Sequence, residues 1–188
     1  MSPVDNRQVN AQATLTQLVP ISELAPGEVS TIRNRFIRTI CELAANELRL
    51  PITSLVVRDI RPKADLDYTY EDWGETTGTT ADAYETMSTG TGSGVSDKWI
   101  GFYGVMVDKD CLGNCTMLKF NIGNGDRAIW ELESLKDEDN GVGFSPAGVV
   151  IPPNTPYTIS RYVRNASSPA RILLKGVVVE PRGKTISP

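Results

Sequence analysis

The chain has 188 residues, of which 40% are hydrophobic, and this length and composition fit one domain with a core. Its net charge of −4 argues against a general affinity for nucleic acid, which needs clustered Lys and Arg. It contains no histidine, which excludes Ser-His-Asp and Cys-His catalysis and histidine-built metal sites. No run of about 18 apolar residues occurs, so no membrane span is expected.

Residues 1–25 are predicted to form an N-terminal arm. Residues 1–12 are polar and lack the basic-then-apolar order of a signal peptide, so we expect no secretion signal. A short apolar patch follows between Leu15 and Leu24. The patch could lie on its own domain or dock on a neighbouring subunit, and a strand within residues 12–19 is one interpretation of it.

A single amphipathic helix is predicted over residues 26–48. Pro26 suits the first turn, where its missing N–H would be unpaired anyway, and Pro51 disfavours helical geometry just before it. We expect the helix to cover one face or end of a sheet. Several arginines lie off the apolar stripe, so a phosphate-binding face is an alternative, although Glu42 and Glu47 dilute its charge. The stripe comprises Val29, Ile32, Phe36, Ile40, Leu43 and Leu48.

The character of the chain changes after a predicted strand over residues 52–60. Residues 64–97 are rich in Asp, Glu, Gly, Thr and Ser and contain no Lys or Arg. We expect a short strand at 66–71 and then a mobile acidic loop over 72–97, because such a long stretch without periodicity is typical of functional or mobile loops. A calcium site is an alternative, although the spacing of the acids differs from that of an EF-hand. The acids concerned are Asp65, Asp67, Glu71, Asp72 and Glu75.

Four aromatic residues in and after this segment are candidates for a platform on which a sugar ring stacks. Tyr68, Tyr70 and Trp73 alternate with acids, and Trp99 lies at the start of the next predicted strand. The alternation also fits a strand edge with one aromatic face. The platform is the basis of our second hypothesis for function, a carbohydrate-binding β-sandwich module.

Strand signals dominate the second half of the chain. The Asn-Gly dipeptide at 124–125 predicts a tight hairpin. Further on, Tyr157, Ile159 and Arg161 fall on one side of an alternating strand. The run Val177–Val179 has no alternation, which predicts a central strand covered on both faces. The predicted strands are 98–107, 116–122, 127–132, 148–151, 157–164 and 171–180.

Cys111 and Cys115 flank a short turn and admit two interpretations. Without further Cys or His nearby, a Cys-x₃-Cys pair does not complete a four-ligand zinc site. In a reducing cytosol both remain free thiols, whereas outside a cell, or in a thermophile, a disulfide between them becomes credible. Cys41 lies on or beside the helical stripe and is interpreted as a small buried hydrophobe.

No motif in the sequence predicts a catalytic residue, a cofactor-binding site or a metal site. The Gly-rich stretch at 90–94 is not followed by the lysine of a phosphate-binding loop. Glu131 and Glu133 fall on one strand face, but adjacent surface acids are common, and we do not interpret them as a glycosidase pair. We therefore expect a protein without catalytic activity or cofactors.

Together these elements predict a mainly β fold. The expected architecture is an antiparallel β-sandwich or jelly roll of about eight strands with one N-terminal amphipathic helix. The domain is expected to span residues 26–181, and residues 182–188 to form a C-terminal tail.

This outline resembles a small single-jelly-roll viral coat or capsid-associated protein. The resemblance rests on the polar arm, the helix, the strands, the Gly/Thr-rich loop, the closing LLKGVVVEPRG strand and the Pro-ended tail, which cover most of the chain. It implies a structural protein of the virion, assembled in the host cytoplasm, that forms symmetric oligomers with copies of itself and with other capsid proteins. Arg7 is the one basic residue of the arm, so a shell, vertex or decoration role fits better than genome packaging.

Overall fold

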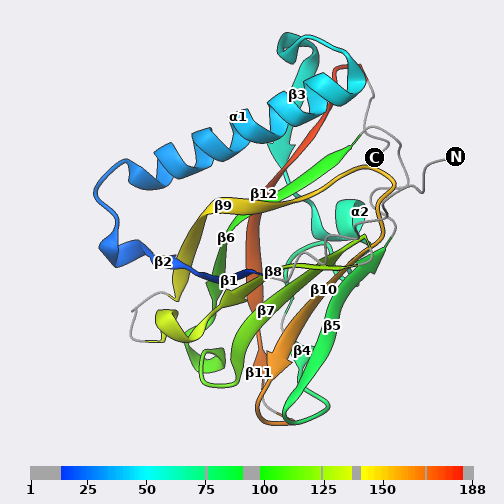
Figure 1. Cartoon of the computed structure of the whole chain (residues 1–188). Coiled ribbons are helices and arrows are strands. Elements are labelled where there is room, and N and C mark those ends of the chain that lie inside the picture. The colour runs from blue at the N-terminus through cyan, green and yellow to red at the C-terminus, as the bar shows by residue number, and fades with distance from the viewer. Residues whose placement is uncertain are drawn as a thin grey trace, which may run out of the picture.

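The structure, a computed structural model, is a β-sandwich with a long helix packed across one of its sheets (Figure 1). The strand pairs within the sandwich are antiparallel apart from one at an edge. The predicted fold class, a mainly β sandwich with one N-terminal amphipathic helix, is confirmed. None of the described helices is long and apolar enough to cross a membrane. The structure describes residues 14–74, 76–90, 98–123, 125–136, 141–167 and 169–183.

Two five-stranded sheets form the sandwich within the described residues. The first sheet contains, in spatial order, β1 (Thr14–Gln17), β8 (Gly125–Glu131), β7 (Cys115–Ile122), β10 (Tyr157–Val163) and β5 (Ala83–Gly90). The second sheet contains β2 (Val19–Pro20), β9 (Val142–Ile151), β6 (Trp99–Val107), β12 (Ile172–Pro181) and β3 (Leu55–Asp59). A short antiparallel ladder joins β4 (Thr76–Thr77) to β11 (Pro169–Ala170). The short helices are η1 (Ile21–Glu23), η2 (Ile52–Ser54), α2 (Pro62–Leu66), η3 (Lys109–Cys111) and η4 (Glu133–Leu135).

The strands pair as a nested set. β7 pairs antiparallel with β8, β6 with β9, β5 with β10, and β3 with β12, so each pair encloses the previous one along the sequence. Successive pairs fall in opposite sheets. An antiparallel ribbon wound in this way places the apolar sides of both sheets on one shared core.

The described part of the predicted arm runs along one edge of the sandwich. β1 adds to the first sheet in parallel with β8, and β2 adds to the second sheet antiparallel to β9 (Figure 1). Between these two strands, Leu18 is buried in the core between the sheets. Residues 14–20 therefore pack on the sandwich of their own chain. Residues 1–13 lie outside the described part of the chain.

The long helix α1 (Glu28–Leu48) begins at Glu28 rather than at the predicted Pro26. Gly27 has a φ of 90°, which lies outside the helical region and is tolerated because glycine lacks a Cβ. The carboxylate of Glu28 accepts a hydrogen bond from the backbone N–H of Ala25 at 2.6 Å, which links the first helical residue to the segment before it. At the other end, Arg49 adopts a φ of 55° and terminates the helix before Pro51.

The apolar face of α1 packs on the second sheet. Phe36 and Ile40 are fully or almost fully buried there, as the helical stripe predicts. Leu43 is an exception, because 48% of its surface is exposed. Ala44 and Ala45 take the buried positions beside it, and their small side chains bring the helix close to the strands.

Hydrophobic side chains fill two layers. Between the sheets, the ring of Phe120 lies 5.7 Å from that of Phe102 and 4.8 Å from that of Trp130. A second layer lies between α1 and the second sheet. The run Val177–Val179 is covered on both faces as predicted, since Val178 belongs to the first layer and its two neighbours to the second.

Two local predictions are wrong. The strand expected at 66–71 is absent, because Pro62 starts the short helix α2 there and Asp67, with a φ of 53°, ends it. The loop expected over 72–97 is interrupted by β5, an edge strand of the first sheet. Glu85 in this strand packs inward against a buried arginine, so the usual alternation of apolar and polar residues is hidden.

A buried ion cluster attaches α2 to the second sheet. Both carboxylate oxygens of Asp65 accept hydrogen bonds of 2.7 Å from the guanidinium of Arg58 on β3, and Lys98 donates a third at 3.0 Å. The backbone N–H of Arg61 donates to the same carboxylate at 2.8 Å. Arg58 also donates to Glu180 of β12 at 3.0 Å. The Asp65 side chain is fully buried, so its charge is balanced by these partners rather than by water.

Candidate functional site

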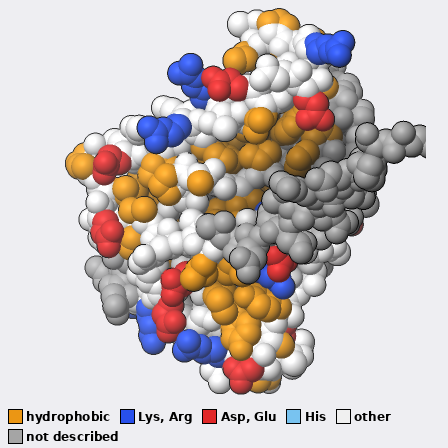
Figure 2. All heavy atoms as spheres, in the orientation of Figure 1, with side chains coloured by type: hydrophobic (Ala, Val, Ile, Leu, Met, Phe, Trp, Pro, Cys, Tyr) orange, Lys and Arg blue, Asp and Glu red, His pale blue; other side chains and the backbone are white. Residues whose placement is uncertain are grey.

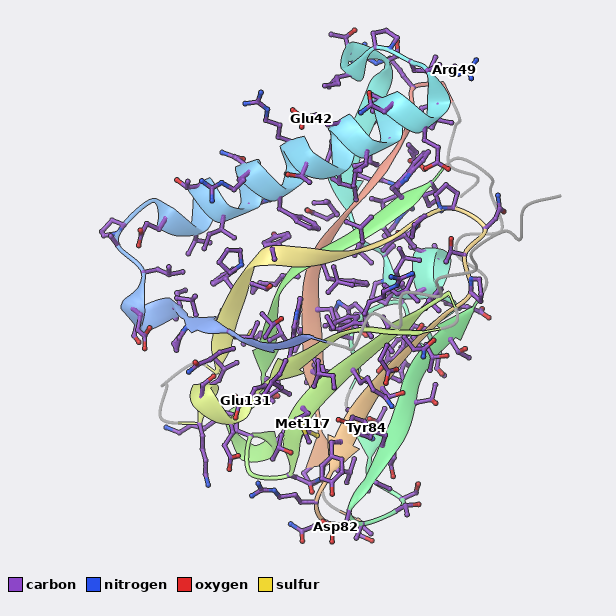
Figure 3. All side chains as sticks on the ribbon, in the orientation of Figure 1. Glu42, Arg49, Asp82, Tyr84, Met117 and Glu131 are labelled. Atoms are coloured by element: carbon purple, nitrogen blue, oxygen red, sulfur yellow. The ribbon has the colours of Figure 1, made fainter. Side chains whose placement is uncertain are left out.

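The outer face of the first sheet carries a row of apolar and aromatic side chains. Tyr84 on β5 is opposite Tyr162 on β10, which is opposite Met117 on β7, which is opposite Glu131 on β8. Figure 3 shows Tyr84, Met117 and Glu131 on the side of the sandwich away from α1. Because α1 covers the second sheet, the two sheets differ in how much of their outer faces meets solvent.

Specific contacts hold this row in place. The rings of Tyr84 and Tyr162 meet edge to face with 5.2 Å between centroids, and the Tyr84 hydroxyl donates to the sulfur of Met117 at 3.7 Å. The Lys119 ammonium lies 4.4 Å from the centre of the Tyr84 ring, a distance that favours a cation–π interaction. Burial, and then the nearby carboxylate of Asp126, raises the pKa of Tyr84, so its hydroxyl remains a donor at neutral pH.

Further apolar side chains extend the row along the sheet. Leu15 on β1, 61% exposed, is opposite Ile129 on β8, which in turn is opposite Lys119. We call Leu15, Tyr84, Met117, Ile129 and Tyr162 the outer patch. Figure 2 shows apolar side chains gathered over β7 and β10, with charged side chains around them.

A cavity of about 330 Å³ is lined by charged residues and by Leu15, Met117 and Tyr162 of the outer patch. Asp82, Glu131 and Glu133 contribute carboxylates, and Arg164 pairs with Glu133 at 3.2 Å. An apolar centre with a charged rim is the usual composition of a protein–protein interface. The outer patch is therefore suited to binding another protein surface.

The four-residue aromatic platform predicted from the sequence does not form. Trp99 lies under α1 and is 2% exposed, so it cannot meet a ligand together with the others. Tyr68 and Trp73 pack on each other with 5.2 Å between ring centroids and are buried in the core between the sheets. Only Tyr70 of the four is well exposed, at 47%. The aromatic alternation in this segment serves packing rather than a flat binding face.

A pocket of about 420 Å³ nevertheless lies beside Tyr68 and Tyr70. Its polar residues include Arg161 from β10 and Glu85 from β5, which form an ion pair at 3.1 Å. Sequence reasoning missed this pocket, although the inward position of Arg161 in an alternating strand was a signal for a buried charge and a partner. The partner was hidden in a segment predicted to be a loop. The remaining lining residues are Thr69, Thr76, Thr77, Thr79, Thr86 and Met87.

Hydrogen bonds fix the charge state of Glu85. Burial alone would raise its pKa, but N–H groups of Thr80 and Thr79, the Thr79 hydroxyl and Arg161 all donate to the carboxylate and lower its pKa to about 2. The carboxylate is therefore ionised over the whole neutral range. It offsets the charge of Arg161, and the pair has no net charge.

The cysteine pair is not oxidised in the structure. Cys111 and Cys115 are both free and buried, as is Cys41. The sulfur of Cys111 accepts a hydrogen bond from the backbone N–H of Arg171 at 3.1 Å. Burial raises the pKa of Cys115 to about 11, so its reactive thiolate form is scarce at neutral pH.

We expect all three thiols to react with Ellman's reagent in guanidinium chloride without reductant, and almost none in the folded protein at pH 8. Burial and the raised pKa of Cys115 are the reasons for this protection. A disulfide between Cys111 and Cys115 would instead leave a single reactive thiol after denaturation. Reaction at full rate in the folded protein would contradict the burial.

The acids considered for a calcium site are not assembled into one in the described residues. Asp65 is occupied by two cationic side chains, and Glu71 pairs with Lys63 at 3.0 Å. No group of three or more acidic or Cys side chains suited to a metal occurs in the described ranges. Glu75 lies outside them.

The geometry therefore offers two features of functional interest: the outer patch on the first sheet, and the threonine-lined pocket at the edge between β5 and β10. Both depend on the sheet register, which places side chains from strands that are distant in the sequence next to each other. Comparison of the chain with protein-family models, with curated proteins and with solved structures found no match to any of them.

Proposed function

We propose that this chain is a structural shell protein, a coat or decoration subunit of a virus particle that associates with copies of itself. The observation that carries the proposal is the outer patch, an apolar and aromatic row on a sheet face that α1 does not cover. Exposed apolar patches rimmed by polar residues are typical of surfaces that bind other proteins. A shell needs such surfaces and needs no catalytic centre.

The nested strand pairing supports the same proposal by analogy. Winding a ribbon of four nested pairs into two sheets is the connectivity expected of a jelly roll, a fold common in virus coats. Fold alone does not establish function. In a shell subunit with this fold, the outer patch rather than a cleft would carry the contacts.

The arm at the sandwich edge adds a second means of contact between subunits. β1 contributes Leu15 to the outer patch, while Leu18 anchors the same segment in the core. A segment held in this way can contact a neighbouring subunit without loosening its own sheet. Lateral contacts in a symmetric shell would then involve both the patch and the arm.

We expect the purified protein to form oligomers in light scattering at high concentration, and Met117→Asp to weaken their association at least about tenfold. Met117 is half-buried at the centre of the row, so a carboxylate there would be desolvated without a partner on association. Negative-stain microscopy across protein and salt concentrations would show whether the oligomers close into particles.

Thr39→Asp is the matched control, because it adds the same charge at an exposed position on α1. This variant should associate like the original protein, and both variants should keep the original melting temperature within a few degrees. A strictly monomeric protein at every concentration, or equal weakening by both variants, would refute the proposal.

A further inference from the structure

A pocket that shares no residue with the outer patch lies at the edge of the sandwich. The pocket of about 420 Å³ is lined by residues 68–70 and 76–79 on one side and by β5 and β10 on the other. Its size falls at the lower end of the range for ligand pockets, roughly 300–1,000 Å³. Two of its lining residues, Thr76 and Thr77, form β4, which pairs with β11 (Figure 1).

The floor of the pocket is charged but balanced. Arg161 is 5% exposed, and its guanidinium donates to Glu85 at 3.1 Å and to the hydroxyl of Thr76. Because Glu85 receives further hydrogen bonds from Thr79 and Thr80, the ion pair is held from both ends. A rigid, neutral pair of this kind offers fixed donors and acceptors without attracting free ions.

The walls are rich in hydroxyl groups. Half of the lining residues are threonines, from residues 69–79 and from β5. A threonine hydroxyl can both donate and accept a hydrogen bond. A ligand hydroxyl has the same dual capacity, so this wall matches a ligand that carries several hydroxyl groups better than one that only accepts.

One aromatic ring is exposed at the pocket. Tyr70 is 47% exposed and contacts Tyr68 with 6.1 Å between ring centroids. The backbone of Gly74 packs close to the same ring, since a Cβ there would lie 2.9 Å from the ring's Cδ2 atom. The ring is therefore positioned on two sides and leaves part of its surface available to an apolar ligand face.

We propose that this pocket binds a neutral saccharide, with a C–H face of a sugar ring on Tyr70 and the sugar hydroxyls on the threonines and the Arg161–Glu85 pair. Phosphate, sulfate or a sialic acid carboxylate fits less well, because the positive charge of Arg161 is already offset by Glu85. The site uses other residues than the outer patch, and its occupancy does not depend on self-association.

Saturation-transfer difference NMR with neutral methyl glycosides tests the proposal. The panel should cover the gluco, galacto, manno, fuco and N-acetylglucosamine configurations at millimolar concentration, with sialyllactose and a sulfated monosaccharide as charged probes. We expect transfer to at least one neutral glycoside, with the strongest signals on the ring protons of one sugar face. Transfer confined to the charged probes, or to no probe, would overturn the proposal.

Two variants assign the binding to this pocket. Tyr70→Ala removes the exposed ring, and Thr77→Val removes one hydroxyl at nearly constant shape; each should weaken binding of the best glycoside by about tenfold or more. Thr53→Val is the control, because this exposed threonine lies in η2 and outside the pocket. Unchanged binding in both pocket variants, with native melting temperatures, would also overturn the assignment. Oligomer size should be measured on the same samples, because loss of glycoside binding without a change in oligomer size would show that the site acts independently of self-association.

Discussion

Replacing Asp65 with asparagine should lower the free energy of unfolding by about 3–5 kcal/mol in urea denaturation. The substitution keeps the shape of the side chain but leaves the charges of Arg58 and Lys98 facing a neutral amide. The Asp65 side chain is fully buried, and those of Arg58 and Lys98 are 15% and 11% exposed. Glu180 alone would remain to balance Arg58, and an unbalanced buried cation is costly.

The acid side of the pH profile provides an independent measurement of the same interaction. Burial by itself would raise the pKa of Asp65, but hydrogen bonds from Arg58, from the Arg61 backbone and from Lys98 outweigh it and lower the pKa. A lowered folded-state pKa adds stability above the unfolded value, about 3.9, and this stability is lost as the pH falls through the folded value. The original protein should therefore lose stability below about pH 4 more steeply than Asp65→Asn.

Asp59→Asn is the control for this prediction. Asp59 lies 3.6 Å from Arg33, but its side chain is 83% exposed, so we expect a change within about 1 kcal/mol. Equal losses in the free energy of unfolding for the two substitutions would mean that the buried Asp65 ion pairs stabilise the fold no more than the exposed Asp59–Arg33 pair does.

Phe36→Ala should destabilise the protein by about 3–5 kcal/mol, because it opens a cavity between α1 and the second sheet. Phe36 is 2% exposed, and its ring lies 6.0 Å from that of Tyr103. The ring also occupies space left by two glycines, since a Cβ at Gly101 would lie 2.6 Å from its Cε1 atom and one at Gly148 2.2 Å from its Cε2 atom. Leu43→Ala, on the exposed side of the same helix, should change stability by about 0.5 kcal/mol or less.

A double-mutant cycle sharpens the Phe36 prediction. Gly101→Ala alone forces a methyl group against Phe36 and Ile40, at a cost of about 1–3 kcal/mol. In the Phe36→Ala background the ring is gone and the new methyl group fills part of the cavity. We therefore expect a favourable coupling of at least about 1 kcal/mol between the two substitutions. Strict additivity would show that the helix shifts to relieve the contact.

Sequence patterns predicted the elements whose apolar side chains repeat with a clear period. The helix over 26–48 and most strands from residue 98 onward matched the structure closely, because packing on one side imposes the repeat. The strand predicted at 148–151 is only the end of the longer β9, Val142–Ile151. Leu43 shows the limit, since it fits the helical stripe and is nevertheless exposed. A stripe drawn from spacing alone does not say where the sheet beneath the helix ends.

The misassigned region between residues 62 and 90 lacked such a repeat for physical reasons. β5 is an edge strand with Glu85 directed inward, and the partner that makes this possible, Arg161, is on a strand far along the sequence. In the sequence, Asp65 likewise appeared to be one of a series of surface acids, but its hydrogen-bond partners are Arg58 on β3 and Lys98. Long-range charge pairing leaves no local pattern, so neither the pocket nor the ion cluster could be located from the sequence.

The nested pairing of strands also has a consequence for the order in which the protein folds. The innermost hairpin, β7–β8, needs only a short loop, whereas β3 and β12 must meet across most of the chain. Closing a longer loop costs more entropy, and topologies dominated by distant contacts fold slowly. Each pair that forms shortens the effective loop for the next, so the chain is expected to zip outward from residues 115–131. The covering helix, which contacts β9, β6 and β12, would gain its full support only near the end of that sequence.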